Sequence, residues 1–285
     1  MIYYEKLSSK NFSNLIELVD EFSKINNYRC NIVDIYKKLN FIKKFFYKNK
    51  VTLILLDNKY IGYIYYEIVT VDTIVINDLY IKEDFLEYVN IIEFNKFQNK
   101  ILIYQVYEDD LTKKILLAND FKRGRITKLL HLNIVYFHKI YENKRISFRT
   151  FKKDVDETLR CNLQNNIFDS NDRIPLQIKD IKYEEKQDFY KKDLCIFMLL
   201  DNKEIGYGQI VYNKNMYMIV NFGVLKEYRG LGYGEYLLNY LVNIAYNLNI
   251  TDLYIRVDYE NYKASNLYSK IGFKFVGYYA TWIKS

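Results

Sequence analysis

The sequence is poor in the residues that mark disulfide-bonded or linker-rich proteins. Among its 285 residues there is one proline, and the three cysteines, Cys30, Cys161 and Cys195, lie far apart with no Cys-x-x-Cys pair. An odd number of widely spaced cysteines argues against a disulfide framework and favours a reducing compartment. One proline and ten glycines leave little room for a disordered linker.

The sequence is equally poor in metal-binding and membrane-spanning signals. Its two histidines, His131 and His138, have no ligand-type spacing to each other or to a cysteine, so we expect no metal site. Residues 1–6 lack the basic-then-apolar layout of a signal peptide, and no apolar run is long enough to span a bilayer. We therefore expect a cytoplasmic protein without a membrane partner.

The composition fits a protein with a full hydrophobic core. Half of the residues are hydrophobic and 27% are charged, and the length allows one large or two ordinary domains. The net charge of +7 is spread along the chain without a dense basic block. This modest excess does not predict nucleic-acid binding, although it suffices to attract a ligand with several phosphates.

The most informative segment is the glycine-rich run at residues 228–235, Tyr-Arg-Gly-Leu-Gly-Tyr-Gly-Glu. An apolar, strand-like segment precedes it at 218–225, and a helical pattern of leucines and isoleucines follows it. A strand, a glycine turn and a helix N-terminus together form an anion site, because free backbone N–H groups and the positive end of the helix dipole meet there. Arg229 adds a positive charge beside this site.

The sequence also contains an internal repeat. Residues 55–63 recur at 199–207, an offset of 144 residues, and the match continues without a gap to residues 83 and 227. Beyond the glycine run the offset becomes 152, so the second copy has eight additional residues where the glycines lie. We infer a duplicated domain with its boundary near 140–145: residues 1–140 form one copy without the loop, and residues 145–285 form a second copy with it.

The second copy alternates between predicted strands and helices. The pattern predicts a mixed α/β fold with a mostly antiparallel central sheet flanked by helices in each copy. The predicted strands of the second copy lie at 146–150, 195–200, 204–212, 216–224, 253–257 and 273–283, and its predicted helices lie at 154–164, 176–190, 233–247 and 263–271.

Three motifs in this order resemble the GNAT superfamily of acyl-CoA-dependent N-acyltransferases. Residues 229–234 resemble its Arg/Gln-x-x-Gly-x-Gly/Ala motif, residues 261–268 its Asn-x-x-Ala-x-x-Leu-Tyr helix, and residues 270–273 its Lys-x-Gly-Phe ending. The three together cover roughly residues 146–285 and are much more specific than one glycine motif alone. The resemblance implies two tandem GNAT-like domains, of which the first is degenerate.

The resemblance also implies a binding site for acetyl-CoA. The loop would hold the pyrophosphate of coenzyme A through backbone N–H groups, and the preceding strand would diverge from its neighbour and pair with the pantetheine arm. A backbone N–H in that strand would also polarise the thioester carbonyl. The residues assigned to the cofactor in this way are Phe222, Gly223, Val224, Arg229, Gly230, Leu231, Gly232, Tyr233, Gly234 and Asn261.

Two of the matched positions have alternative interpretations. Asn261 is a polar contact near the pantetheine by resemblance, and it is also a good helix N-cap. Tyr268 is the general acid that protonates the leaving thiolate by resemblance, and it is also one of 31 tyrosines, many of them suited to a core.

The general base is not predicted. Some family members have a glutamate where this sequence has Arg256, which cannot accept a proton. Asp258, Glu260 and Glu204 are nearby candidates, each also interpretable as a surface charge, and a water relay is an alternative. Arg256 itself either faces an anionic substrate or is solvated or paired.

The resemblance implies an acetyl-CoA-dependent N-acetyltransferase whose second half is active on a small-molecule or peptide amine. In the first copy Leu116, Asp109 and Asp120 replace Tyr268, Asn261 and Gly272, which implies a scaffold or substrate-shaping role. The alternatives are an acyl-CoA-binding regulator without catalysis and an aminoacyl transferase of the tandem type. We expect the protein to be either a monomer, in which the two halves form a pseudo-dimer, or a homodimer.

Overall fold

The computed structural model describes residues 1–26, 31–88, 97–136, 143–170, 173–213 and 215–285. Cys30, His138 and residues 140–142 of the expected boundary at 140–145 lie outside the described residues. The chain divides into two compact units. Unit 1 consists of Met1–Thr127 and Gly277–Ser285, and unit 2 consists of Lys128–Val276.

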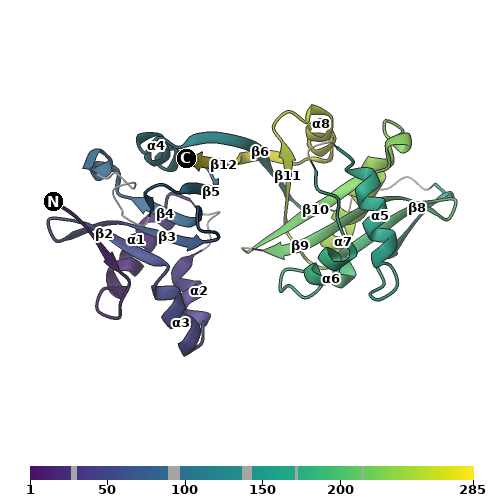
Figure 1. Ribbon diagram of the computed structural model, residues 1–285. Helices are drawn as coiled ribbons and strands as arrows, with labels where there is room; N and C mark the ends of the chain where they lie inside the picture. The colour runs from purple at the N-terminus through teal and green to yellow at the C-terminus, as the bar shows by residue number, and fades with distance from the viewer. Residues whose placement is uncertain (27–30, 89–96, 137–142, 171–172, 214) are drawn as a thin grey trace. The chain divides into compact units, whose positions relative to one another are not determined.

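Unit 1 is a mixed sheet with helices (Figure 1). Its strands follow the order β1-β2-β3-β4-β5-β12-β6, in which β4 and β5 run parallel. Its elements in chain order are β1 (Ile2–Lys6), α1 (Phe12–Ser23), α2 (Ile32–Lys38), α3 (Phe41–Lys48), β2 (Val51–Leu56), β3 (Lys59–Ile68), β4 (Thr73–Ile81), the 3-10 turn η1 (Glu83–Tyr88), β5 (Ile101–Tyr107), α4 (Asp110–Ala118) and β6 (Lys122–Asn133).

Unit 2 has the order β6-β11-β10-β9-β8-β7, in which β10 and β11 run parallel. Its elements are β7 (Ile146–Thr150), α5 (Glu157–Ile167), α6 (Ile178–Glu184), η4 (Lys192–Leu194), β8 (Cys195–Leu200), β9 (Lys203–Asn213), β10 (Met216–Val224), η5 (Lys226–Tyr228), α7 (Tyr233–Asn247), β11 (Asp252–Asp258) and α8 (Tyr262–Ile271), and the last strand, β12 (Lys274–Lys284), begins in unit 2 and continues in unit 1.

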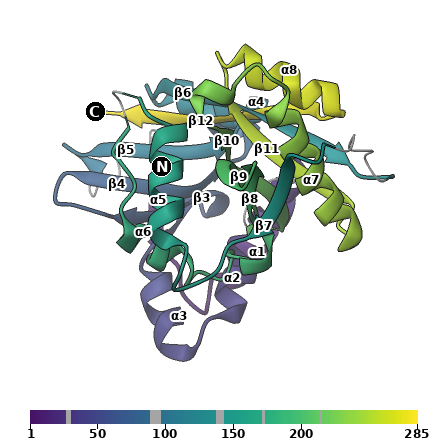
Figure 2. The same cartoon turned by 90° about the vertical axis from the view of Figure 1, so that its right-hand side faces the viewer.

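The sheet of unit 2 is covered on both faces, which explains why β8 is apolar along its whole length. Ile196 and Met198 belong to a core cluster with α7 and α8, whereas Phe197 and Leu199 belong to a second cluster with α5 and α6. Successive side chains of a strand point to opposite faces, so a strand between two helical layers loses the usual polar alternation. Figure 2 shows the same elements after a quarter turn.

The same strand registers occur in both units. Ile2 pairs with Leu56 in unit 1 and Ile146 with Leu200 in unit 2, at the offset of the sequence repeat. Each following hairpin turns through an Asp-Asn pair with positive φ at both residues, 47° and 65° in unit 1 and 49° and 65° in unit 2. Positive φ at both turn positions is the type I′ geometry that suits a two-residue hairpin.

The division into units differs from the expected one at the last strand. Residues 277–285 belong to unit 1, although the sequence repeat assigns them to the second copy. β12 pairs antiparallel with β5, and Ala280 and Trp282 lie in the core of unit 1. In the same way Leu130 and Leu132, at the end of β6, lie in the core of unit 2. The repeat therefore defines the order of elements, whereas strand pairing defines the compact units.

The predicted helices of unit 2 differ from the observed ones in the region before β8. The helix expected at 176–190 is a short helix, α6, which ends at Glu184, and the helix expected at 154–164 is shifted to α5. α7 agrees with its expected range of 233–247, and α8 agrees within one residue.

Candidate functional site

The site begins where β10 and β11 separate. Their parallel pairing covers Tyr217 to Ile219 on β10, opposite Leu253 to Ile255 on β11. Both strands continue beyond these pairs, β10 to Val224 and β11 to Asp258. The last residues of β10 thus form ladder bonds with β9 on one side and present backbone groups on the other. This is the divergence that the sequence resemblance implied for Phe222, Gly223 and Val224.

A bulge at the end of β10 produces this divergence. The register with β9 shifts between Val220 and Gly223, and Asn221 has a φ of 52°. A bulge twists a strand away from its neighbour, and asparagine tolerates left-handed backbone better than most residues. A Cβ added at Gly223 would lie 2.5 Å from Cγ2 of Ile167, so the close approach of α5 requires glycine there.

The glycine run forms the turn between η5 and α7. Gly230 and Gly232 have φ values of +79° and +86°, and Gly232 is the N-cap of α7. Within the part of the chain that the structure describes, no acceptor is found for the backbone N–H groups of residues 230–234, and Glu235 is the first to donate, to the carbonyl of Gly232 at 3.0 Å.

This turn leaves its backbone open to an anionic ligand. Open space surrounds the position of a Cβ at Gly230 and at Gly232, so the backbone is accessible to a ligand. Positive φ, rather than a lack of room, is what makes glycine the suitable residue at both positions. Gly234 is different, because a Cβ there would lie 3.4 Å from Leu267, in ordinary contact. Exposed N–H groups at the positive end of a 15-residue helix form an anion-binding cradle.

Arg229, at the start of the glycine turn, makes hydrogen bonds to two neighbouring elements. Its Nε donates to the carbonyl of Val224 at 3.1 Å, and its Nη2 donates to the carbonyl of Ile167. The guanidinium thus joins the end of β10 to the end of α5. The expected positive charge beside the anion site is present, but two of the nitrogen atoms of the guanidinium are engaged by protein carbonyls.

Tyr268 lies in the core next to the diverging strand. Its side chain is 6% exposed, and its ring centroid lies 6.0 Å from that of Phe222 and 6.2 Å from that of Phe273. Burial raises the pKa of the Tyr268 phenol above its usual range, so the hydroxyl keeps its proton well beyond neutral pH. The structure thus supports the interpretation of Tyr268 as a core tyrosine and also places it at the diverging strand.

Asn261 caps α8. Its Oδ1 accepts the backbone N–H of Ala264 at 3.1 Å, which is the N-cap geometry weighed in the sequence. The cap uses the side-chain oxygen, so the amide nitrogen can still donate to a ligand.

The candidates for a general base differ in their surroundings. Glu204 accepts from Arg149 at 2.9 Å, and Arg149 also pairs with Asp156 at 2.7 Å, so Glu204 belongs to an ion-pair network. Oδ1 of Asp258 accepts the N–H of Glu260 at 3.3 Å.

Arg256 is exposed, on the face of β11 opposite to the side chains that pack with Tyr268. Val257 and Ile255 alternate with it along the strand and belong to the core that contains Tyr268.

The sequence analysis missed a buried polar network under α5. Arg160 is fully buried, its Nη2 lies 2.5 Å from Oε2 of Glu184, and its guanidinium carbon lies 5.1 Å from the ring centroid of Tyr207. Oε1 of Glu184 accepts from Gln209, which in turn accepts from the Tyr207 hydroxyl at 2.7 Å.

The position of this network in the sheet relates it to the site. Tyr207 pairs with Gly223 across β9 and β10, so the network lies beside the bulge. The available signal in the sequence was that Arg160 occupies the same helical face as Leu163, Gln164 and Ile167, all of them buried.

In unit 1 the equivalent strands also separate, since the pairing of β4 with β5 ends at Ile76 and Tyr104 while β4 continues to Ile81, but the glycine turn that follows β10 has no counterpart in the sequence after β4. The position of Gly223 is occupied by Leu79, which is fully buried, and that of Phe222 by Asp78, which is 5% exposed. Asp78 accepts the Tyr63 hydroxyl at 2.7 Å. Unit 1 therefore differs from unit 2 in the side chains at this strand end and in the missing glycine turn, and not in the separation of the strands.

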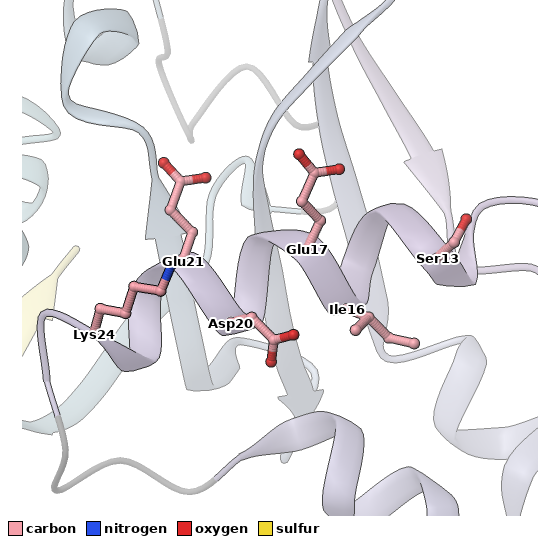
Figure 3. A pocket seen from close by; sticks show the side chains of 6 residues that line it. All are labelled: Ser13, Ile16, Glu17, Asp20, Glu21 and Lys24. Atoms are coloured by element: carbon pink, nitrogen blue, oxygen red, sulfur yellow. The ribbon is translucent and has the colours of Figure 1, made fainter.

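A hollow of about 560 Å³ lies elsewhere, on the surface of α1 in unit 1. Figure 3 shows its six lining side chains, which come from α1 and its C-cap Lys24; half of them are acidic, namely Glu17, Asp20 and Glu21. Glu21 pairs with Lys82 at 3.0 Å. None of the residues that line it belongs to the predicted site.

The described residues show neither a metal-binding cluster nor a membrane-spanning helix. They contain no cluster of three or more histidine, cysteine or acidic side chains that could hold a metal ion. No helix within the described ranges is long and apolar enough to cross a membrane.

Comparisons with known proteins agree with this geometry. Residues 162–273 match the model of the Acetyltransferase (GNAT) family. A search of curated proteins finds no sequence match. Among solved structures, a GCN5-related N-acetyltransferase from Sphaerobacter thermophilus is similar with a TM-score of 0.71 and 14% identity, over 99% of this chain and 95% of that one.

Two further structures are similar along nearly their whole length. A tandem GNAT protein from the clavulanic acid biosynthesis pathway has a TM-score of 0.61 and 12% identity, over 100% of this chain and 98% of that one. A GNAT-family acetyltransferase from Colwellia psychrerythraea has a TM-score of 0.61 and 11% identity, over 99% and 98% of the two chains. The chain therefore has the fold of GNAT proteins, and its residues 162–273 form a domain of the GNAT acetyltransferase family, whose members are acyltransferases.

Proposed function

We propose that this protein is an acetyl-CoA-dependent N-acetyltransferase whose active site lies in unit 2. The observation that carries the proposal is the combination of free N–H groups at residues 230–234 with the end of β10 that has separated from β11. Together they provide an anion cradle and a free strand edge side by side. A phosphorylated ligand with an amide-containing arm, as in coenzyme A, matches both.

The binding roles follow from the backbone. The N–H groups of the cradle bind the pyrophosphate, with the helix dipole of α7 behind them. The free edge of residues 222–224 forms hydrogen bonds with the amides of the pantetheine arm, as a strand would. An N–H of this edge also donates to the thioester carbonyl oxygen, where negative charge develops during attack.

The chemical roles need few side chains. Acetyl-CoA, when bound, supplies the thioester that an amine attacks directly, without a cysteine intermediate. Burial keeps the Tyr268 phenol protonated, so Oη holds a proton to donate to the departing sulfur. Because burial also makes this phenol a weaker acid, the proton moves only as negative charge accumulates on the sulfur in the same desolvated site.

No cysteine serves as a nucleophile in this proposal. Cys195 is buried in β8, and burial raises the pKa of its thiol, which disfavours the thiolate. The incoming amine loses its proton to water or to a carboxylate. Asp258, the last residue of β11, and Glu260, two residues further on, are the candidates, since Glu204 is already paired with Arg149.

Calorimetry and an activity screen test the proposal together. Titration of the full chain with acetyl-CoA should give one site per chain, because the segment that follows β4 in unit 1 lacks the glycine loop. A panel of primary amines with acetyl-CoA, monitored by release of free thiol, should identify an acceptor. Two sites per chain would contradict the assignment to unit 2 alone, and tight binding without turnover of any amine would favour an acyl-CoA-binding regulator.

A further inference from the structure

Helix α3 (Phe41–Lys48) carries its apolar side chains on the outside of unit 1. Phe41, Ile42, Phe45 and Phe46 are 88%, 68%, 64% and 60% exposed, and we call these four side chains the α3 face. Single exposed apolar residues are ordinary, but four large ones on two adjacent turns form a contiguous patch. Such a patch marks a surface that contacts something else.

The orientation of α3 is fixed by Tyr47. Tyr47 is 5% exposed, its hydroxyl donates to the carbonyl of Ile32 at 3.0 Å, and its ring centroid lies 4.9 Å from that of Tyr65. At about 3.6 residues per turn, the α3 face covers an arc of roughly 140° whose middle is opposite Tyr47. The helix is therefore amphipathic with its apolar side turned away from the core, and both views place it at the outer edge of unit 1, away from its strands (Figures 1 and 2).

The two helices at this surface, α2 and α3, are rich in lysine. Lysines at positions 37, 38, 43, 44 and 48 lie on α2 and α3, where Asp34 is the one acidic residue of the two helices. Lys44 lies with its Nζ 5.4 Å from the ring centroid of Tyr36, on the side of α3 that faces unit 1. The surface thus combines exposed phenylalanines with a rim of positive charge.

This combination restricts the partner. A second copy would meet this face with its own, because a two-fold interface brings identical patches together and would place lysines against lysines. The partner must be apolar in the middle and negative around it. A bilayer that contains anionic lipids offers both, and a convex helix with protruding phenylalanines suits the boundary between headgroups and acyl chains better than it suits the rim of a protein groove.

We propose that the α3 face docks the protein on an anionic lipid surface, with the phenylalanines inserted between headgroups and the lysines at the phosphates. Peripheral docking needs no spanning helix, so the finding on helix length does not bear on it. The proposal amends the expectation from the sequence that the protein has no membrane partner. It concerns a part of unit 1 outside the acyl-transfer site and is independent of the proposed enzymatic activity.

Flotation of the full chain with vesicles tests the proposal. The chain should float with vesicles of equal parts phosphatidylglycerol and phosphatidylcholine, and far less with phosphatidylcholine alone. The double variant Phe41→Ser/Phe45→Ser and the double variant Lys37→Glu/Lys43→Glu should each weaken binding about tenfold or more, the second most clearly at low salt.

A matched control distinguishes binding through the α3 face from nonspecific adsorption of exposed apolar residues. Val71 is 81% exposed in the connection between β3 and β4 of unit 1, outside α2 and α3, so Val71→Ser should float like the parent chain. Phe41→Trp adds a second tryptophan to the chain as a fluorescent reporter. The natural one, Trp282, is buried and contributes a constant background, so the emission of the new tryptophan should shift to the blue with anionic vesicles. Failure of the parent chain to float with anionic vesicles would overturn the proposal, as would a concentration-dependent dimer abolished by Phe41→Ser/Phe45→Ser or an equal loss of binding in Val71→Ser.

Discussion

Nε of Arg229 donates to the backbone carbonyl of Val224 at 3.1 Å, and the same guanidinium reaches the carbonyl of Ile167, 62 residues away in sequence. The positively charged side chain of the loop motif therefore links the strand that would hold the pantetheine to the helix that covers it. Mutation of Arg229 therefore changes the position of the anion cradle as well as its charge, and a loss of ligand binding reflects both effects.

Replacement of Arg229 by alanine should weaken binding of acetyl-CoA roughly tenfold and lower the free energy of unfolding by about 1.5–3 kcal/mol, the range for hydrogen bonds to a charged group. Calorimetry and urea denaturation measure the two effects. Lys226→Ala is the control, since Lys226 pairs with Asp169 at the surface, 54% and 70% exposed, and such a pair contributes little. An unchanged free energy of unfolding in Arg229→Ala would show that these two hydrogen bonds do not stabilise the fold.

Replacement of Gly223 by alanine should destabilise unit 2 and reduce acyl transfer. The new Cβ would lie 2.5 Å from Cγ2 of Ile167, and relief of such overpacking typically costs about 1–3 kcal/mol. Gly277→Ala is the control, because no heavy atom lies within 4 Å of a Cβ there. The double variant Gly223→Ala/Ile167→Ala should recover part of the lost activity; if it does not, the steric explanation is wrong.

Replacement of Tyr268 by phenylalanine should slow thiol release roughly 100-fold, within the usual range for a positioned proton donor, while binding of acetyl-CoA is unchanged. The ring and its packing against Phe222 and Phe273 are kept, so the fold should persist. Tyr246→Phe, at an exposed position near the end of α7, is the matched control. Equal turnover in both variants would remove Tyr268 from catalysis.

The buried pair Arg160 and Glu184 should show strong coupling in a double-mutant cycle. Arg160→Met alone leaves Glu184 without its cation and should cost about 3–5 kcal/mol, whereas Arg160→Met/Glu184→Leu should cost less because no buried charge is left. Thermal or urea unfolding measures each corner of the cycle. Simple additivity of the two single changes would show that the pair is not coupled.

The stability of unit 2 should fall at alkaline pH. Burial raises the pKa of Tyr207 and of Tyr268 above the usual value of about 10, so both keep their protons in the folded chain while the unfolded chain loses them. Below about pH 10 both states are protonated and there is no effect; above it the free energy of unfolding should decrease by up to about 1.4 kcal/mol per pH unit for each tyrosine. Urea unfolding across this range measures the slope, and Tyr268→Phe should reduce it; an identical slope in that variant would contradict the assignment.

Local chemistry made several parts of the fold predictable. The glycine run predicted the start of α7, and Asn261 predicted the start of α8, because each effect acts within a few residues. The region before β8 was less predictable. Arg160 and Gln164 interrupt the apolar face of α5, and their burial depends on Glu184 and on the strand beneath, which no local pattern reveals.

The sequence by itself determined the repeat, the family resemblance and the position of the anion loop, since all three depend on residue identity at short spacing. Only the tertiary structure decided which strand completes which unit, because β12 is assigned by its pairing with β5 and by the burial of Trp282, both between distant segments. It also decided the partners of Arg229 and the outward orientation of α3. These depend on which backbone carbonyls and which core positions lie within reach once the chain has folded.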